Sequence, residues 1–214
     1  MRRREYPATK TSHWIPIYNM ETFQSRKTRR SKISCSTRRR DAVVKYSGII
    51  YNDVVAGPGF FLTFFTSGCP HHCPGCHNPE TWDENYGYEF TDDTIREIIN
   101  SLHKNGIERG LAIQGGEPLY HHNLEIVDRI ITAVKAIYPS TPIYIWTGGI
   151  FENHLKDAES NPVLRHILSL TDVLIDGPYQ QDKRDITLYL RGSSNQRVID
   201  VQASLRIGET VCLV

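Results

Sequence analysis

Short apolar runs recur along residues 43–214, and each is closely followed by glycine. They are FFLTFFTSG (60–68), GLAIQ (110–114), PIYIWTGG (142–149) and DVLIDG (172–177). Runs of this length, rich in β-branched and aromatic residues and bounded by glycine, predict buried strands.

The segments between these runs carry apolar residues at every third or fourth position, which predicts amphipathic helices. The first segment, TDDTIREIINSLHKNG, begins with Thr91 as its N-cap and stops at Gly106. The second has its apolar stripe between residues 124 and 137 and is closed by Pro139. The third, PVLRHILSL, follows Asn161 as its N-cap.

Strands that alternate with helices predict an α/β fold with right-handed crossovers. We expect a parallel sheet with the helices outside it. In such sheets ligands bind at the carboxyl ends of the strands. Here those ends carry a cysteine-rich loop and the sequences GGEP, WTGG and DGP. We therefore expect these three loops to meet the cysteines on one face of the molecule.

The charge of the chain is unevenly distributed, although its 214 residues sum to only +1. Residues 1–40 contain 12 Lys and Arg against 2 acidic residues, so this head is near +10 and the remainder near −9. Such a composition predicts a disordered, basic extension over residues 1–42, solvated rather than bound to nucleic acid or a membrane surface. The alternative is upstream sequence translated from a wrong start, with the true start near Val43 or Val44. Residues 43–214 then form one domain.

Cysteine usage and hydropathy indicate the compartment. No run of 18 or more apolar residues occurs, and the first thirty residues lack the apolar segment of a secretory signal. Three of the five cysteines crowd into eight positions, which in a reducing compartment indicates metal binding or catalysis rather than disulfides. We expect a cytoplasmic protein without a membrane partner.

The candidate chemistry lies in SGCPHHCPGCHNPETW, where Cys69, Cys73 and Cys76 form a C-x3-C-x2-C pattern. Proline and glycine between them prevent regular structure, so the thiolates can fold inward around one centre. Three thiolates suit either a zinc ion completed by a histidine or an iron-sulfur cluster with one open iron. The position after a buried strand, facing a glycine-rich turn, favours the open iron. The candidates for a fourth zinc ligand are His71, His72 and His77.

Several motifs taken together resemble those of one protein family. They are GPG (57–59), SGCPHHCPGCHNPETW, GGEPL, WTG, DVLIDGPYQQDKRD and LRGSSNQRVID. With these motifs the chain resembles the radical S-adenosylmethionine superfamily. Within that superfamily it resembles the activating proteins of anaerobic (class III) ribonucleoside-triphosphate reductases. The resemblance runs from about residue 46 to residue 205 and leaves the basic head uncovered.

The resemblance implies a fold, two cofactors and a set of site residues. The fold is a partial (β/α) barrel of about five or six parallel strands, as in the core of the superfamily. The three cysteines would hold one 4Fe-4S cluster, whose fourth iron is chelated by S-adenosylmethionine. Glu117 would shape the turn beside the methionine part of that cofactor. The positions that match cofactor contacts are Gly75, Cys76, His77, Gly115, Gly116 and Glu117.

The implied reaction is reductive cleavage of S-adenosylmethionine to methionine and a 5′-deoxyadenosyl radical. That radical removes a hydrogen from a glycine of the partner, an anaerobic ribonucleoside-triphosphate reductase. The implied electron donor is a protein such as flavodoxin or ferredoxin. CHNPETWD is also similar to the pyruvate formate-lyase activating enzymes, which share the chemistry and differ in the partner. A third hypothesis is a zinc-binding interaction module whose basic head contacts nucleic acid.

The sequence departs from the family at two places. Many members have Arg in the segment just after GPG, where this chain has Phe60 and Phe61. The residue after the third cysteine is often Tyr in the family and is His77 here.

Some polar and aromatic residues outside the cysteine loop allow two interpretations. Trp146 could line the cofactor pocket or pack in the core. Asp176 could accept a hydrogen bond from a ribose or simply terminate its strand. Arg191 and Arg197, which flank GSSNQ, could bind a carboxylate, contact the partner or be ordinary surface charges.

Overall fold

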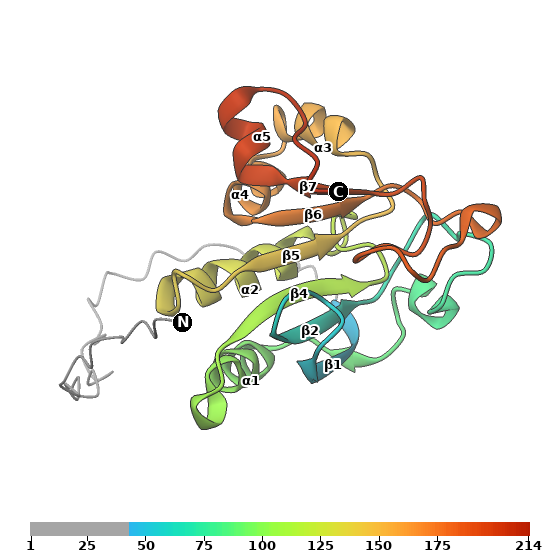
Figure 1. Ribbon diagram of the computed structural model, residues 1–214. Helices are drawn as coiled ribbons and strands as arrows, with labels where there is room; N and C mark the ends of the chain where they lie inside the picture. The colour runs from blue at the N-terminus through green and yellow to red at the C-terminus, as the bar shows by residue number, and fades with distance from the viewer. Residues whose placement is uncertain (1–42) are drawn as a thin grey trace, which may run out of the picture. The chain divides into compact units, whose positions relative to one another are not determined.

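The computed structural model describes residues 43–214, and a seven-stranded sheet runs through it (Figure 1). The strands lie in the order β3-β1-β2-β4-β5-β6-β7. Their bounds are β1 Lys45–Asp53, β2 Phe60–Thr66, β3 Tyr88–Glu89, β4 Arg109–Gly115, β5 Ile143–Trp146, β6 Val173–Asp176 and β7 Arg197–Asp200. The predicted extension over residues 1–42, and its wrong-start alternative, lie outside the described residues.

The four central strands β2, β4, β5 and β6 run parallel, while both edges of the sheet are antiparallel. The predicted α/β fold is confirmed, with an open sheet as in a partial barrel. The expected number of five or six parallel strands is wrong. Residues 54–59 join β1 to β2 and are too few for the crossover that parallel neighbours need. Residues 177–196 join β6 to β7 without an α-helix, so β7 returns antiparallel.

Five α-helices occur in the described residues. They are α1 Asp92–Leu102, α2 Leu124–Ile137, α3 Phe151–Ala158, α4 Pro162–Leu170 and α5 Val201–Ile207. Helices α1, α2 and α4 confirm the predicted segments, whereas α3 and α5 were not predicted. At the start of α4, Asn161 Oδ1 accepts the backbone N–H groups of Val163 and Leu164, each at 3.1 Å. None of the helices in residues 43–214 has the length and apolar character needed to cross a bilayer.

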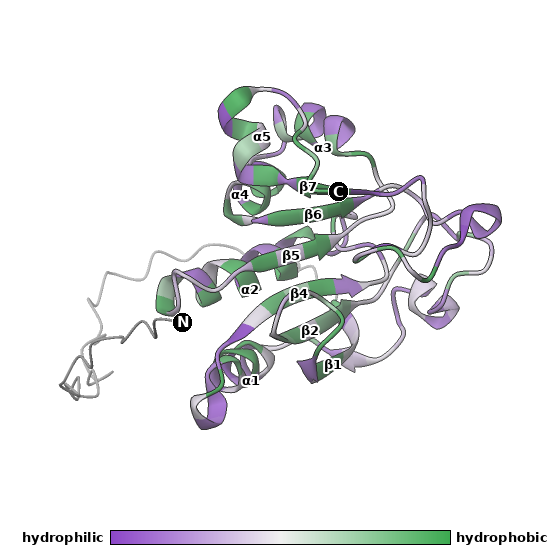
Figure 2. Ribbon diagram, viewed as in Figure 1, coloured by the Kyte–Doolittle hydropathy of each residue, from purple (hydrophilic) through white to green (hydrophobic). Residues whose placement is uncertain are grey.

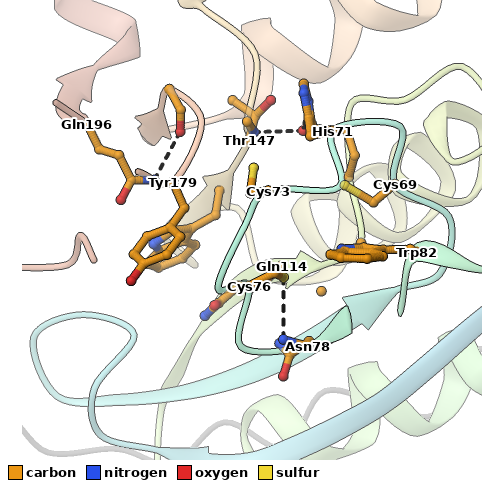
Figure 3. A pocket seen from close by; sticks show the side chains of 16 residues that line it. Cys69, His71, Cys73, Cys76, Asn78, Trp82, Gln114, Thr147, Tyr179 and Gln196 are labelled. Atoms are coloured by element: carbon orange, nitrogen blue, oxygen red, sulfur yellow. Dashed lines mark hydrogen bonds and ion pairs between the residues drawn. The ribbon is translucent and has the colours of Figure 1, made fainter. Parts of the chain in front are cut away.

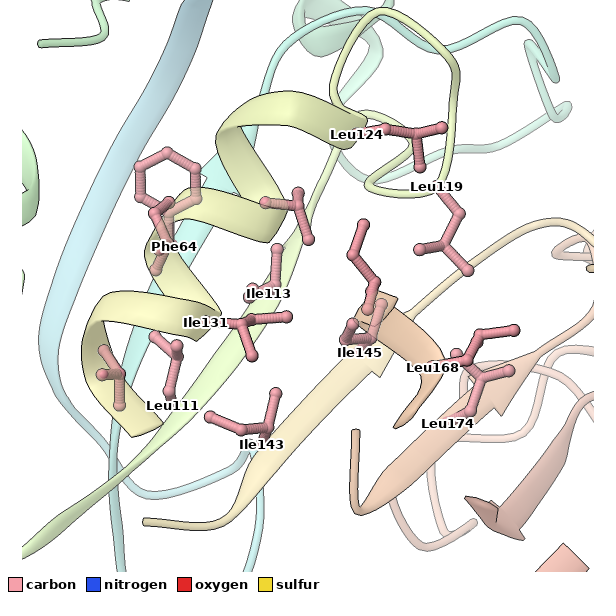
Figure 4. Packing of buried hydrophobic residues seen from close by; sticks show 14 of the residues in the cluster. Phe64, Leu111, Ile113, Leu119, Leu124, Ile131, Ile143, Ile145, Leu168 and Leu174 are labelled. Atoms are coloured by element: carbon pink, nitrogen blue, oxygen red, sulfur yellow. The ribbon is translucent and has the colours of Figure 1, made fainter. Parts of the chain in front are cut away.

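One face of the sheet packs against helices and forms the main core (Figure 4). Leu111 and Ile113 of β4 and Ile143 and Ile145 of β5 are fully buried there, in one cluster with Ile131 of α2. The central strands are hydrophobic along most of their length, while the helices mix hydrophobic and hydrophilic stretches (Figure 2). This is the pattern from which the strands and the amphipathic helices were predicted.

The other face of the sheet carries a smaller aromatic cluster. Because side chains alternate along a strand, Ala112, Tyr144 and Trp146 point away from the main core. The ring centroid of Tyr144 lies 5.0 Å from that of Phe61 in β2 and 6.5 Å from that of Trp146. Trp146 is the last residue of β5, so the aromatic face leads directly into the loops at the carboxyl ends of the strands.

Candidate functional site

The loops that follow β2, β4, β5 and β6 meet at one end of the sheet and line a cavity of about 170 Å³ (Figure 3). The loop after β2 contributes Cys69, Cys73 and Cys76. Residues 115–117 line the cavity after β4, and residues 146–148 line it at the end of β5. The structure therefore brings together the four loops that the strand pattern predicted to converge.

The backbone N–H of Asn78 donates to Cys76 Sγ at 3.4 Å. Backbone N–H groups near the Cys69 and Cys73 sulfurs, among them those of His71 and Tyr179, favour the thiolates. Burial raises the pKa of the Cys69 and Cys73 thiols, so both stay protonated until a metal takes the place of the proton. Backbone N–H groups that point at the sulfurs then stabilise the thiolates and influence the reduction potential of a bound cluster.

The arrangement of donors fits a cluster better than a single ion. In residues 43–214, no group of three or more His, Cys, Asp or Glu side chains surrounds one position where a single metal ion could sit. A 4Fe-4S cluster takes each thiolate on a different iron, so its ligands line a cavity without converging on one point. Three half-buried, free thiols on one cavity wall match that requirement.

The histidines of the cysteine loop point in different directions. His71 Nε2 lies 2.9 Å from Glu117 Oε2, which accepts its N–H. The hydrogen bond with this carboxylate raises the pKa of His71. The ring of His72 lies 4.8 Å from that of Trp82, between centroids. His77 is exposed and does not line the cavity.

Glu117 connects three of the loops, a role that sequence reasoning missed. It is only 3% exposed, and Oε2 accepts the backbone N–H of Gly148 at 2.7 Å as well as that of the His71 ring. Oε1 accepts the N–H of Leu119 at 3.0 Å. The loops after β2, β4 and β5 are thus held to one carboxylate. The motif GGEP predicts that Glu117 lies at the site. Its hydrogen-bond partners His71 and Gly148 are distant in the sequence, so no local pattern indicates these contacts.

The predicted glycines after β4 allow two strand ends to approach each other closely. Gly115 has φ +101°, and a Cβ there would lie 2.7 Å from the backbone N and O of Thr66. A Cβ on Gly116 would lie 2.5 Å from the carbonyl oxygen of Gly68, just before the first cysteine. The turn therefore supports the base of the cysteine loop while it lines the cavity. Gly75, another predicted cofactor contact, does not line the cavity.

The segments DGP and RGSSNQR interact with each other. Asp176 is fully buried and accepts N–H groups from the backbone of Phe151 at 2.8 Å and from Arg197 Nε at 2.9 Å. Gln196 Nε2 donates to the carbonyl of Gly177 at 3.0 Å. These contacts hold the loop after β6 against the cavity. Asp176 and Arg197 thus bind to each other, and the other partner of Asp176 named here, Phe151, also belongs to this chain.

The structure also gives contacts for Trp146 and Arg191. Trp146 both lines the cavity and donates its indole N–H to the carbonyl of Leu190 at 2.8 Å. Arg191 donates through Nη1 to the carbonyl of Gln196 at 2.9 Å. Both interpretations of Trp146 hold, because it lines the cavity and also packs against the smaller hydrophobic clusters.

Comparison with known proteins decides the family. Residues 55–199 match the family model described as a 4Fe-4S single cluster domain. The anaerobic ribonucleoside-triphosphate reductase-activating protein of Escherichia coli (strain K12) is 40% identical over 147 residues, which cover 68% of this chain and 92% of that protein. The protein of the same name from Enterobacteria phage T4 is 39% identical over 155 residues, covering 72% and 93%. The one from Pasteurella multocida (strain Pm70) is 38% identical over 145 residues, covering 67% and 89%. The chain belongs to this family of activating proteins.

Membership of the activating-protein family confirms the resemblance seen in the motifs. It also confirms the cofactors, one 4Fe-4S cluster and S-adenosylmethionine, that the family implies. The three free cysteines that line the cavity fit the cluster. The assignment of individual ligands and cofactor contacts stays a prediction.

Within the activating-protein family, the departure at Phe60 and Phe61 has a structural explanation in this chain. Phe61 is 1% exposed and packs on Tyr144, whereas Phe60 is 44% exposed. A Cβ on Gly57 would lie 2.4 Å from the Phe61 ring, so the GPG segment folds over this aromatic side chain. Near the place where many family members have Arg, this chain thus has a buried aromatic side chain, Phe61, instead of a charge.

Proposed function

We propose that this protein reductively cleaves S-adenosylmethionine at a 4Fe-4S cluster held by Cys69, Cys73 and Cys76. Its substrate is a glycine of an anaerobic ribonucleoside-triphosphate reductase. The observation that carries the proposal is the joint lining of one cavity by three free thiols and two glycine turns, in a chain of the activating-protein family. Three thiolates leave one iron of the cluster without a cysteine ligand and so free to bind the cofactor.

The residues of the cavity have separate tasks in this reaction. When bound and reduced, the cluster supplies the electron that cleaves S-adenosylmethionine to methionine and a 5′-deoxyadenosyl radical. The three thiolates hold the cluster, and their backbone N–H donors stabilise its negative charge. Gly115 and Gly116 line the cavity with their backbone, which the methionine part can approach. Trp146 and Tyr179 supply aromatic walls of the same cavity.

The proposed protein partners follow from the chemistry. A one-electron donor such as flavodoxin or ferredoxin reduces the cluster. The sheet is open rather than closed into a barrel, and the reductase reaches the cavity through this incomplete wall. A pyruvate formate-lyase-type activase would use the same chemistry, but the relatives named above carry the reductase in their names.

The first test is made on protein purified without oxygen. We expect about four irons per chain and an electron paramagnetic resonance spectrum of the reduced cluster that changes when S-adenosylmethionine is added. One zinc per chain, with no iron after reconstitution, would establish the zinc-binding module instead. Formation of a glycyl radical on added reductase, compared with formate-lyase, separates the two activase hypotheses.

The ligand assignment is tested by substitution. Cys73→Ala should abolish cleavage of S-adenosylmethionine because it removes one of the three thiolates that line the cavity. Cys212→Ser is the matched control, since Cys212 is an exposed free thiol outside the cavity, and it should keep full activity. Full activity in Cys73→Ala would contradict the proposed cluster.

A further inference from the structure

We propose that His71 is a positioning residue for cofactor binding, acting through Glu117 and Gly148 rather than as a ligand of the cluster. The inference rests on the proposed function, since it concerns how the cluster loop is placed relative to the S-adenosylmethionine site. It assigns a role to a side chain that lies between two cluster ligands and binds neither metal nor cofactor itself.

The first observation is a hydrogen-bonded bridge between three loops that line the cavity. His71 Nε2 donates to Glu117 Oε2 at 2.9 Å, and the same oxygen accepts the backbone N–H of Gly148 at 2.7 Å. The Glu117 side chain is 4% exposed and that of His71 is 29% exposed. A carboxylate this buried needs its donors, because an unpaired buried charge is strongly unfavourable. Loss of the His71 donor would therefore let Glu117 and both attached loops shift.

The second observation is a packing contact that does not depend on the hydrogen bond. A Cβ on Gly148 would lie 2.6 Å from His71 Cδ2 and 2.8 Å from its Nε2. The imidazole thus lies directly on the backbone of the turn after β5. Only glycine leaves room for it. The loop after β2 and the turn after β5 are therefore held at a distance that the His71 ring sets.

The position of the bridge indicates which property it controls. Cys69, His71 and Cys73 line the cavity from the cysteine loop, while Glu117 and Gly148 line it from the loops after β4 and β5. The ring therefore sets the separation between the cysteine loop and the two loops that line the cavity beside it. Its loss should weaken binding of S-adenosylmethionine while leaving the three thiolates, and hence the iron content, in place.

The neighbouring histidine provides a matched control. The His72 ring lies against Trp82 and does not line this cavity, and its backbone has φ 45°. Asparagine tolerates that left-handed conformation, so His72→Asn removes an imidazole from the same loop without straining it. A general disturbance of the loop would affect both positions, whereas the proposed bridge involves His71 alone.

The experiment uses cluster-loaded protein and measures iron content, the spectrum of the reduced cluster and the dissociation constant of S-adenosylmethionine. His71→Leu should keep about four irons but bind the cofactor on the order of 10-fold more weakly. Losses of this size are usual for residues that orient the ligands of a metal site without contacting the metal. His71→Gln retains a donor at similar reach and should restore most of the affinity. His72→Asn should behave as the unmodified protein.

The packing contact between His71 and Gly148 allows a second, independent test. Gly148→Ala should displace the His71 ring and weaken cofactor binding as His71→Leu does. In a His71→Ala background the added methyl group has space, so Gly148→Ala should cost nothing further.

Three results would overturn the inference: unchanged affinity in His71→Leu, failure of His71→Gln to restore it, or additive losses in the His71→Ala/Gly148→Ala double variant. These failures are distinct from failure of the proposed function, because the latter would appear as an absent cluster in the unmodified protein.

Discussion

At the scale of single residues, Arg197 fastens one edge of the sheet. Its guanidinium donates to Asp176, which is fully buried, and to Glu152 Oε1 and Oε2 at 2.9 and 2.8 Å. These hydrogen bonds lower the pKa of Glu152 to about 2. Asp176 also accepts the N–H of Phe151, the first residue of α3. One arginine thus links β6, β7 and α3 beneath the loop that lines the cavity.

Replacement of Arg197 should destabilise the fold more than replacement of its exposed partner. Arg197→Ala leaves the buried Asp176 carboxylate without its cationic partner, which we expect to lower the free energy of unfolding by about 3 kcal/mol. Glu152→Gln removes only a half-exposed partner and should cost under about 1 kcal/mol. Thermal unfolding of both variants without oxygen measures the difference. Equal losses would mean that Asp176 does not depend on Arg197.

At the scale of elements, Gly115 fixes the turn after β4, because a side chain at this position would clash with the backbone of β2. In the parallel register Gly115 pairs with Thr66, and the backbone of Thr66 occupies the space a Cβ would need. Gly115 also has φ +101°, a conformation that side chains disfavour. The close approach of β2 and β4 therefore holds the cysteine loop and the glycine turn together.

Gly115→Ala should lose far more stability than Gly106→Ala, although both glycines have positive φ. Gly106, after α1, has φ +74° with nothing within 4 Å of where a Cβ would lie, so its substitution should cost about 1 kcal/mol. At Gly115 the same strain is joined by a clash with backbone. We expect Gly115→Ala to lower the unfolding temperature further and to reduce iron content. Matching unfolding temperatures in the two variants would refute the clash.

The elements that the sequence predicted are those with a strong local signal. Strands β2, β4, β5 and β6 are continuous apolar runs, and α1 and α4 have recognisable N-caps. The antiparallel edges were missed because β1 and β7 depend on pairing partners, and α3 has a mostly polar sequence, FENHLKDA. Tertiary contacts decide such elements more than propensity does.

The same distinction applies to the candidate site. The three cysteines share one short loop, so their spacing alone indicates a common centre. The bridge from His71 to Glu117 joins residues 46 positions apart, and Gly148 lies a further 31 positions along the chain. No local pattern connects them. They meet because parallel strands bring their carboxyl ends to one edge of the sheet.

At the scale of the whole molecule, the site and the basic head are separate in the sequence. Every cavity residue lies between Cys69 and Gln196, and the family model covers residues 55–199. The head, residues 1–42, contains 12 of the 25 Lys and Arg residues and precedes an acidic remainder. Long-range attraction from such a segment would act on encounter rates with an acidic partner and would weaken as salt is added.

Deletion of residues 1–42 should leave cleavage of S-adenosylmethionine unchanged, because the residues assigned to the cluster and cofactor all remain. We also expect the rate of glycyl radical formation on the reductase to match that of the full chain at both low and raised salt, as a solvated head requires. The two rates are measured side by side in oxygen-free buffer at each ionic strength. A deficit confined to low salt would show that the head attracts the partner electrostatically. A deficit at every salt concentration would mean that residues 1–42 make specific contacts with the reductase.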